Sequence, residues 1–332
     1  MREIGSDFWE VPIIDQQNRL FPETIQWYLS GRSALQAIII ELGKEKSISL
    51  PSWCCESMIK PFADANYSIR FYPVVFENGE LIQKIRMDAD VLYLMDYFGY
   101  SSSGLTINNY HGIVIRDVTH SIFSSIYSEA DYFFGSLRKW CGVWTGGYVW
   151  ARDGHGLEAG CSNESSYITL RKKAMEEKKA YMEGIREDKG YLEAFDSAED
   201  CLLEAGIAPA ADRDVKLAKL LNVEKIKKQR RINAEVLRSA FAEWLLFPEL
   251  KSTDTPMFVP VLVPDGKRDA LRHHLIKHKI YCPVHWPISK YHLLDERTAN
   301  IYRNGLSLVC DQRYTKEDMY RMVKTIREFM EG

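Results

Sequence analysis

Short apolar runs alternate with amphipathic stretches through the first part of the chain. The runs that predict strands are residues 47–50, 68–75, 91–95, 112–117, 132–135 and 147–151. Residues 32–42 repeat apolar side chains with the period of a helix, and residues 55–66 read as a second helix. Because several runs are apolar throughout, we expect both faces of these strands to be covered. The alternation therefore predicts an α/β domain with a mainly parallel sheet.

The pattern changes twice farther along the chain. Residues 167–244 are rich in Lys, Glu, Arg, Ala and Leu, and they predict long helices that break near residues 206–209. The elements predicted after them are a strand at 257–263, a helix at 267–278, strands at 281–286 and 306–310, and a final helix that Thr315 opens with a capping box. We therefore predict a large α/β domain, 1–245, whose helical segment 167–245 leads out of it, and a small α+β domain, 246–332.

Composition narrows the range of partners. A net charge of −3 gives no electrostatic reason to expect nucleic acid or an anionic membrane as partner. No apolar run approaches the roughly 18 residues of a membrane-spanning helix, and acidic residues stand where a signal peptide would have its apolar core. The seven cysteines are scattered without CxxC spacing. We therefore expect reduced thiols, a cytoplasmic protein and no metal site.

One lysine and one aspartate carry the strongest chemical signal. Lys139 lies in an aromatic, glycine-rich segment, 131–147, where a lysine is costly unless it is paired or covalently used. Asp117 ends the apolar run 112–117. A pyridoxal phosphate (PLP) site requires such a pair: the lysine forms a Schiff base with the cofactor aldehyde, and the carboxylate keeps the pyridine nitrogen protonated. The alternatives are a surface lysine in a loop and an aspartate that caps a helix or forms a salt bridge.

Two serine-containing segments are candidates for holding the cofactor phosphate. The turn 30–35 precedes an apolar helix, where Gly31, Arg32 and Ser33 could bind an anion through the helix N-terminus, a charge and a hydroxyl. Ser136 stands three residues before Lys139 and could hold the same phosphate. Arg138 is expected to lower the pKa of its lysine neighbour. For the turn, a simple helix N-cap is the alternative.

Two ring side chains are candidates for the face and edge of the cofactor. Trp53 follows the first predicted strand, at the edge where ligands bind an α/β sheet. His120 stands three residues after Asp117 and could form a hydrogen bond to the cofactor. The alternatives are a core or interface tryptophan and a structural histidine.

The order of these motifs resembles the DegT/DnrJ/StrS family of PLP-dependent aminotransferases, which have fold type I and act on nucleotide-linked sugars. The segments that carry the resemblance are 30–35, 51–53, 117–120, 139–147, 283–287 and 306–308. The resemblance implies a mainly parallel seven-stranded sheet, PLP as cofactor and a homodimer. It also makes His285 and Arg313 candidates for substrate contacts, with a satisfied strand histidine and a surface arginine as alternatives.

The function that the resemblance implies is transamination. An amino-acid donor, by family habit glutamate, would give its amine to a keto substrate, expected to be a nucleotide-linked keto-sugar in cell-surface polysaccharide or secondary-metabolite synthesis. The alternatives are another PLP-dependent reaction, of the lyase or dehydratase type, and a non-catalytic relative of the fold. The dehydratases of this family have histidine in place of the lysine, so Lys139 argues against that reading.

Overall fold

The computed structural model describes residues 3–101, 107–124, 129–160 and 166–332. It divides into two compact units, each built from segments far apart in the sequence. The first unit consists of Met1–Gly5, Glu45–Ala130 and Glu224–Gly332, and the second of Ser6–Lys44 and Asp131–Val223. The border predicted at residue 245 divides the chain differently and stays a prediction.

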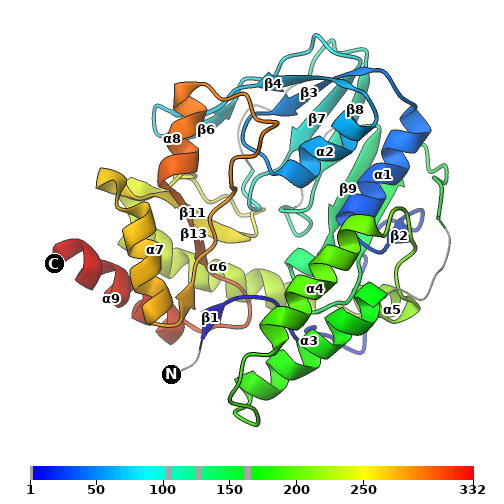
Figure 1. Cartoon of the computed structure of the whole chain (residues 1–332). Helices are drawn as coiled ribbons and strands as arrows, with labels where there is room; N and C mark the ends of the chain where they lie inside the picture. Colours follow the sequence, from blue (N-terminus) through cyan, green and yellow to red (C-terminus); the bar gives the residue numbers. More distant parts are fainter. Residues whose placement is uncertain (1–2, 102–106, 125–128, 161–165) are drawn as a thin grey trace. The chain divides into compact units, whose positions relative to one another are not determined.

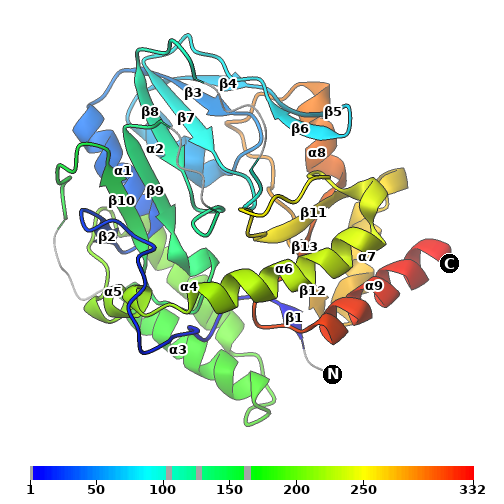
Figure 2. The same cartoon turned by 180° about the vertical axis from the view of Figure 1, so that it is seen from behind.

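Parallel strands form the main sheet of the first unit. In spatial order they are β4 (Ser68–Tyr72), β3 (Ser47–Pro51), β7 (Val91–Met95) and β8 (Ile113–Asp117). Figure 2 shows β7 and β8 side by side. Strand β7 is buried throughout and β8 is buried from Val114 to Asp117, as expected where both faces of a sheet are covered. The helix predicted at residues 55–66 is α2 (Glu56–Asp64).

The predicted run 68–75 is two strands rather than one. Pro73 separates β4 from β5 (Val74–Glu77), which pairs with β6 (Glu80–Gln83) in a separate antiparallel hairpin. A proline has no N–H to donate to a neighbouring strand, so it ends the pairing of β4 at this point.

The C-terminal part of the first unit is an α+β arrangement. Its elements are β1 (Ile4–Gly5), α6 (Val223–Ala240), β11 (Phe258–Leu262), α7 (Arg268–Lys277), β12 (Ile280–Tyr281), α8 (Glu296–Asn304), β13 (Gly305–Val309) and α9 (Lys316–Glu331). A core that includes Val259, Leu271, Leu306 and Met319 holds them together. The capping box at Thr315 is confirmed, since its backbone N–H donates to Asp318 Oδ2 at 3.1 Å. The strand predicted at residues 281–286 is wrong beyond Tyr281.

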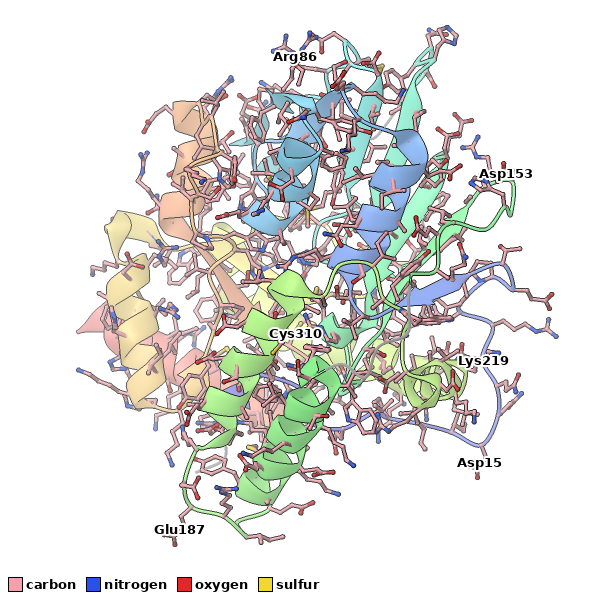
Figure 3. All side chains as sticks on the ribbon, turned by 45° about the vertical axis from the view of Figure 1, so that its right-hand side comes forward. Asp15, Arg86, Asp153, Glu187, Lys219 and Cys310 are labelled. Carbon is pink, nitrogen blue, oxygen red and sulfur yellow. The ribbon has the colours of Figure 1, made fainter. Side chains whose placement is uncertain are left out.

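Antiparallel strands and a helical hairpin make up the second unit. The elements are β2 (Gln26–Tyr28), α1 (Gly31–Leu42), β9 (Tyr132–Ser136), β10 (Gly147–Ala151), α3 (Ser166–Met182), α4 (Tyr191–Glu204) and α5 (Asp212–Lys219), with β10 between β9 and β2. Helices α3 and α4 lie side by side (Figure 1), and Glu187 marks the tip of their hairpin (Figure 3). The helical break predicted at residues 206–209 is confirmed between α4 and α5.

Within the described residues the main sheet counts seven strands. The predicted α/β class and seven-stranded sheet are confirmed. Strand β2 was not predicted, because three residues of mixed polarity carry no periodic signal. None of the helices in the described part of the chain has the length and apolar character needed to cross a membrane.

Candidate cofactor site

Asp117 is a buried carboxylate at the C-terminal end of β8. The hydroxyl of Tyr93 donates to Asp117 Oδ2 at 2.7 Å, and the backbone N–H of Thr119 donates to Oδ1 at 2.8 Å. Both donors stabilise the negatively charged form of the carboxyl group. The predicted acid is therefore held as an acceptor, which is the form that can pair with a protonated ring nitrogen.

Arg116 lies next to Asp117 but serves the opposite face of the sheet, because successive strand side chains alternate. Its guanidinium binds Asp96, with Nε and Nη2 at 3.0 and 2.8 Å from Oδ1. Asp96 also accepts a hydrogen bond from the Ser121 hydroxyl at 2.9 Å, and its backbone N–H donates to the Asp117 carbonyl at 3.1 Å. This buried pair anchors the turn that contains Asp117 and His120.

Three of the predicted site residues meet in one aromatic cluster of the first unit. Trp53 donates from Nε1 to the backbone carbonyl of His285 at 2.8 Å, and its ring stacks on Tyr97 with centroids 4.8 Å apart. The ring of Trp286 lies 5.6 Å from Trp53 and 5.7 Å from His120, centroid to centroid. His285 Nδ1 lies 2.8 Å from the Ser307 hydroxyl. The ring that was predicted to stack on the cofactor therefore packs on Tyr97, and its role toward the cofactor stays a prediction.

Arg313 is buried and bonded to a carboxylate rather than exposed. Its Nε and Nη2 donate to the two oxygens of Asp311 at 2.9 and 2.8 Å. Burial alone would raise the pKa of Asp311, but the charge and hydrogen bonds of Arg313 outweigh it and hold that pKa below its ordinary value. The alternative of a surface arginine is wrong, and the predicted contact of Arg313 with substrate stays a prediction.

Replacing Arg313 with leucine is expected to lower the free energy of unfolding by about 3–5 kcal/mol at pH 7, because Asp311 would be left buried and unpaired. The pair lowers the pKa of Asp311 in the folded state, so its stabilisation is present at neutral pH and lost as the pH falls through that value. The difference between variant and wild type should therefore shrink in acid. Urea denaturation at pH 7 and at about pH 2 measures both effects, because the folded-state pKa of Asp311 lies below its ordinary value of 3.8.

Arg303→Leu is the matched control, since Arg303 is exposed and pairs with the exposed Glu296. It should cost less than about 1 kcal/mol. An equally small cost for Arg313→Leu at pH 7 would contradict the assignment of a structural pair.

In the second unit, the turn before α1 lies very close to strands β9 and β10. Ser30 caps the helix, since its hydroxyl accepts from the Ser33 backbone N–H at 3.1 Å. A Cβ on Gly147 would lie 1.9 Å from the Ser30 carbonyl oxygen, and one on Gly31 would lie 3.2 Å from Ser136 Cβ. Only glycine allows β9, β10 and the α1 N-terminus to approach this closely. The two segments predicted to hold the phosphate are therefore neighbours.

At this turn, the Ser33 hydroxyl already has a hydrogen-bond partner, whereas one N–H group of Arg32 has none among the described residues. The Ser33 hydroxyl donates to the Gly206 carbonyl at 2.8 Å, so its proton is used within the protein. Arg32 Nη1 is buried and has no hydrogen-bond partner among the described residues. A buried guanidinium N–H without an acceptor is costly, and an anion at the helix N-terminus would satisfy it. The turn thus fits a phosphate through Arg32 and the helix N-terminus better than through Ser33.

Lys139 is exposed, so the expectation of a buried amine is wrong. It ends a 3₁₀ turn, Leu137–Lys139, whose three side chains point in different directions because the turn has three residues per revolution. Leu137 occupies the buried position. Lys139 has no hydrogen bond or ion pair to any residue that the structure describes, so its amine is available for chemistry.

Arg138 forms an ion pair with Glu199, and its guanidinium lies 5.7 Å from the ring centroid of Tyr167. Burial would raise the pKa of Glu199, but the charges of Arg138, Arg171 and Arg32 hold it below its ordinary value. The predicted effect of Arg138 on Lys139 stays a prediction.

Metal ligation has no geometric support in the described residues, since no three His, Cys, Asp or Glu side chains gather there. PLP fits better. Asp117 offers a buried carboxylate that accepts two hydrogen bonds, Arg32 an unsatisfied donor and Lys139 an amine without a partner among the described residues. Sequence reasoning found these three residues but missed Tyr93, Thr119 and Asp96, which hold the carboxylate and its turn.

The fold is that of the type I PLP-dependent transferases, as solved structures show. The chain is similar to a DegT DnrJ EryC1 StrS aminotransferase from Brucella abortus, with 14% identity, a TM-score of 0.61, and coverage of 92% of this chain and 85% of that one. It is similar to NtdA from Bacillus subtilis with bound cofactor PMP, with 14% identity, a TM-score of 0.64, and coverage of 93% and 73%. It is also similar to DesI in the presence of its TDP-sugar product, with 12% identity, a TM-score of 0.63, and coverage of 91% and 79%.

Sequence comparison adds no closer relative. No protein-family model matches the chain, and no curated protein matches it. The likeness to the solved structures establishes the fold at low identity, which fixes the path of the chain and leaves its chemistry to the residues of the site.

Proposed function

We propose that this protein is a PLP-dependent aminotransferase. The observation that carries the proposal is Asp117, a buried carboxylate held as an acceptor by Tyr93 and Thr119 at the end of a strand. Lys139, with an amine that has no partner among the described residues, supports it within the same fold. A carboxylate at a strand end and a free lysine are the two groups that PLP chemistry requires of a protein.

Each residue has a role that follows from its chemistry. When bound, PLP supplies an aldehyde for the substrate amine and a ring that accepts electrons. Asp117 would keep the ring nitrogen protonated, and Lys139 would hold the cofactor and move the substrate proton. Gly31, Arg32 and Ser136 would hold the phosphate, with Ser33 excluded as a donor because its hydroxyl donates to the Gly206 carbonyl, and Trp53 and His120 would contact the ring.

The acceptor we propose is a nucleotide-linked keto-sugar, and the donor is glutamate. The sugar acceptor is supported by the similarity to DesI, whose structure was determined in the presence of its TDP-sugar product. His285 and Arg313 are the proposed substrate contacts. A cytoplasmic homodimer serving cell-surface polysaccharide or secondary-metabolite synthesis completes the proposal.

The test is a half-reaction. Purified protein should bind PLP and turn yellow, and addition of glutamate should convert the bound cofactor to pyridoxamine phosphate with release of one 2-oxoglutarate per site. Nucleotide-linked keto-sugars should then restore the original spectrum, whereas simple keto acids other than 2-oxoglutarate should not. Failure to take up PLP would refute the proposal. Uptake without conversion by any common amino donor would favour a lyase or dehydratase reaction.

A further inference from the structure

Tyr93 is a polar residue within an otherwise apolar buried strand. In the parallel pairing of β7 and β8, Met95 lies opposite Asp117 and Tyr93 lies opposite Ile115. Because strand side chains alternate, Tyr93 and Asp117 share one face of the sheet as diagonal neighbours. A tyrosine can span this diagonal, and its hydroxyl reaches Asp117 Oδ2 at 2.7 Å.

The position of Tyr93 is fixed from several sides. Its side chain is fully buried, and its ring meets Phe62 edge-on with centroids 6.2 Å apart. Its backbone carbonyl accepts a hydrogen bond from the hydroxyl of Tyr72 at 3.0 Å. A phenol that is buried and clamped in this way delivers its O–H in one direction, so the hydrogen bond to Asp117 is preorganised.

We propose that Tyr93 is a positioning residue for Asp117, whose hydroxyl orients the carboxylate and keeps it ionised for the ring nitrogen of the cofactor. The proposal rests on the proposed function as far as the cofactor is concerned. The hydrogen bond itself belongs to the protein alone. A hydrogen bond to a charged group contributes about 1.5–3 kcal/mol, which is enough to shift the protonation of its acceptor substantially.

The protonation of this pair is coupled. Burial and the negative charge of Asp117 both raise the pKa of Tyr93 far above its ordinary value, so the phenol remains the donor at every pH of interest. The other titratable or charged groups that this unit places around the pair are Cys54, Cys55, Tyr72, Tyr97, His120 and the Asp96–Arg116 pair. Among them, the Asp96–Arg116 pair is internally compensated and lies on the other face of the sheet.

The experiment removes one hydroxyl. In Tyr93→Phe, we expect Asp117 to become protonated at a higher pH than in the wild type. This can be followed in the cofactor-free protein by 13C NMR of aspartate carboxyls, with the Asp117 signal assigned by its loss in Asp117→Asn. In the same variant, the dissociation constant of PLP should rise by about tenfold. The rise should be larger at pH 6 than at pH 8, because a protonated Asp117 cannot accept the ring N–H.

Tyr100→Phe is the matched control. Tyr100 is also buried, and it loses a hydroxyl that donates to the Phe258 carbonyl without touching Tyr93 or Asp117. A purely structural role for Tyr93 would lower the melting temperature of both variants and leave both Asp117 titrations at the wild-type pH. That result would overturn the inference. If the Asp117 titration shifts in Tyr93→Phe but the wild-type protein never binds PLP, Tyr93 keeps its role and the proposed function is refuted.

Discussion

Lys139→Ala is expected to lose transaminase turnover by about 10⁴-fold, because the proposed mechanism uses its amine both to bind the cofactor and to move a proton. The structure makes this variant a clean test. Lys139 is exposed and has no hydrogen bond or ion pair in the described part of the chain, so its removal should change the free energy of unfolding by less than about 0.5 kcal/mol. Loss of activity in a protein of unchanged melting temperature would therefore be chemical in origin.

Borohydride reduction adds a readout that does not depend on turnover. It should fix PLP on the wild-type chain, and peptide mass spectrometry should find the label on the peptide that contains Lys139. Lys219→Ala is the control, since this exposed lysine lies at the end of α5 (Figure 3). It should keep both the label and the activity. A label on any other lysine, or full activity in Lys139→Ala, would contradict the assignment.

The strands were predictable where composition alone determines burial. The runs 91–95 and 112–115 are apolar because both faces are covered, and the predicted strands 91–95 and 112–117 correspond to β7 and β8 within one residue. The break at Pro73 could have been read from the missing N–H of proline. Strand β2 and the end of β12 could not, because two or three residues do not make a period, and their pairing is decided by neighbours distant in sequence.

The charged residues of the site could be predicted from the sequence, but the residues that hydrogen-bond to them could not. Asp117 stands out because a carboxylate ends an apolar run, and Lys139 because a lysine interrupts an aromatic one. Tyr93 gave no signal, since a tyrosine in an apolar run is ordinary for a buried strand. Its contact with Asp117 depends on the register of β7 and β8, which the sequence does not state.

The exposure of Lys139 also could not be predicted from its neighbours in sequence. Aromatic neighbours in sequence predicted burial, but a 3₁₀ turn directs adjacent side chains in different directions, and Leu137 took the buried position. Trp53 likewise stacks on Tyr97, which lies 44 residues farther along the chain. Composition near a residue predicts its surroundings only when the local backbone repeats regularly.

Asp117→Asn is expected to lower turnover by about 10²–10³-fold while PLP remains bound through Lys139. An amide has nearly the shape of a carboxylate but carries no charge, so it cannot hold the ring nitrogen in its protonated form. It also presents an NH₂ group toward Tyr93 or Thr119, both of which donate to the native carboxylate. The variant therefore loses the charge that stabilises electron flow into the ring, together with one well-placed hydrogen bond.

A cofactor analogue methylated at the ring nitrogen separates charge from geometry, because it is cationic whatever stands at position 117. Reconstituted with this analogue, Asp117→Asn should recover at least tenfold of its lost turnover, whereas the wild type should gain nothing. Stopped-flow measurement of the glutamate half-reaction, with PLP and with the analogue, gives both rates. If Asp117→Asn with PLP turned over at the wild-type rate, the ring nitrogen would need no protein charge, and the aspartate would be a structural end to β8.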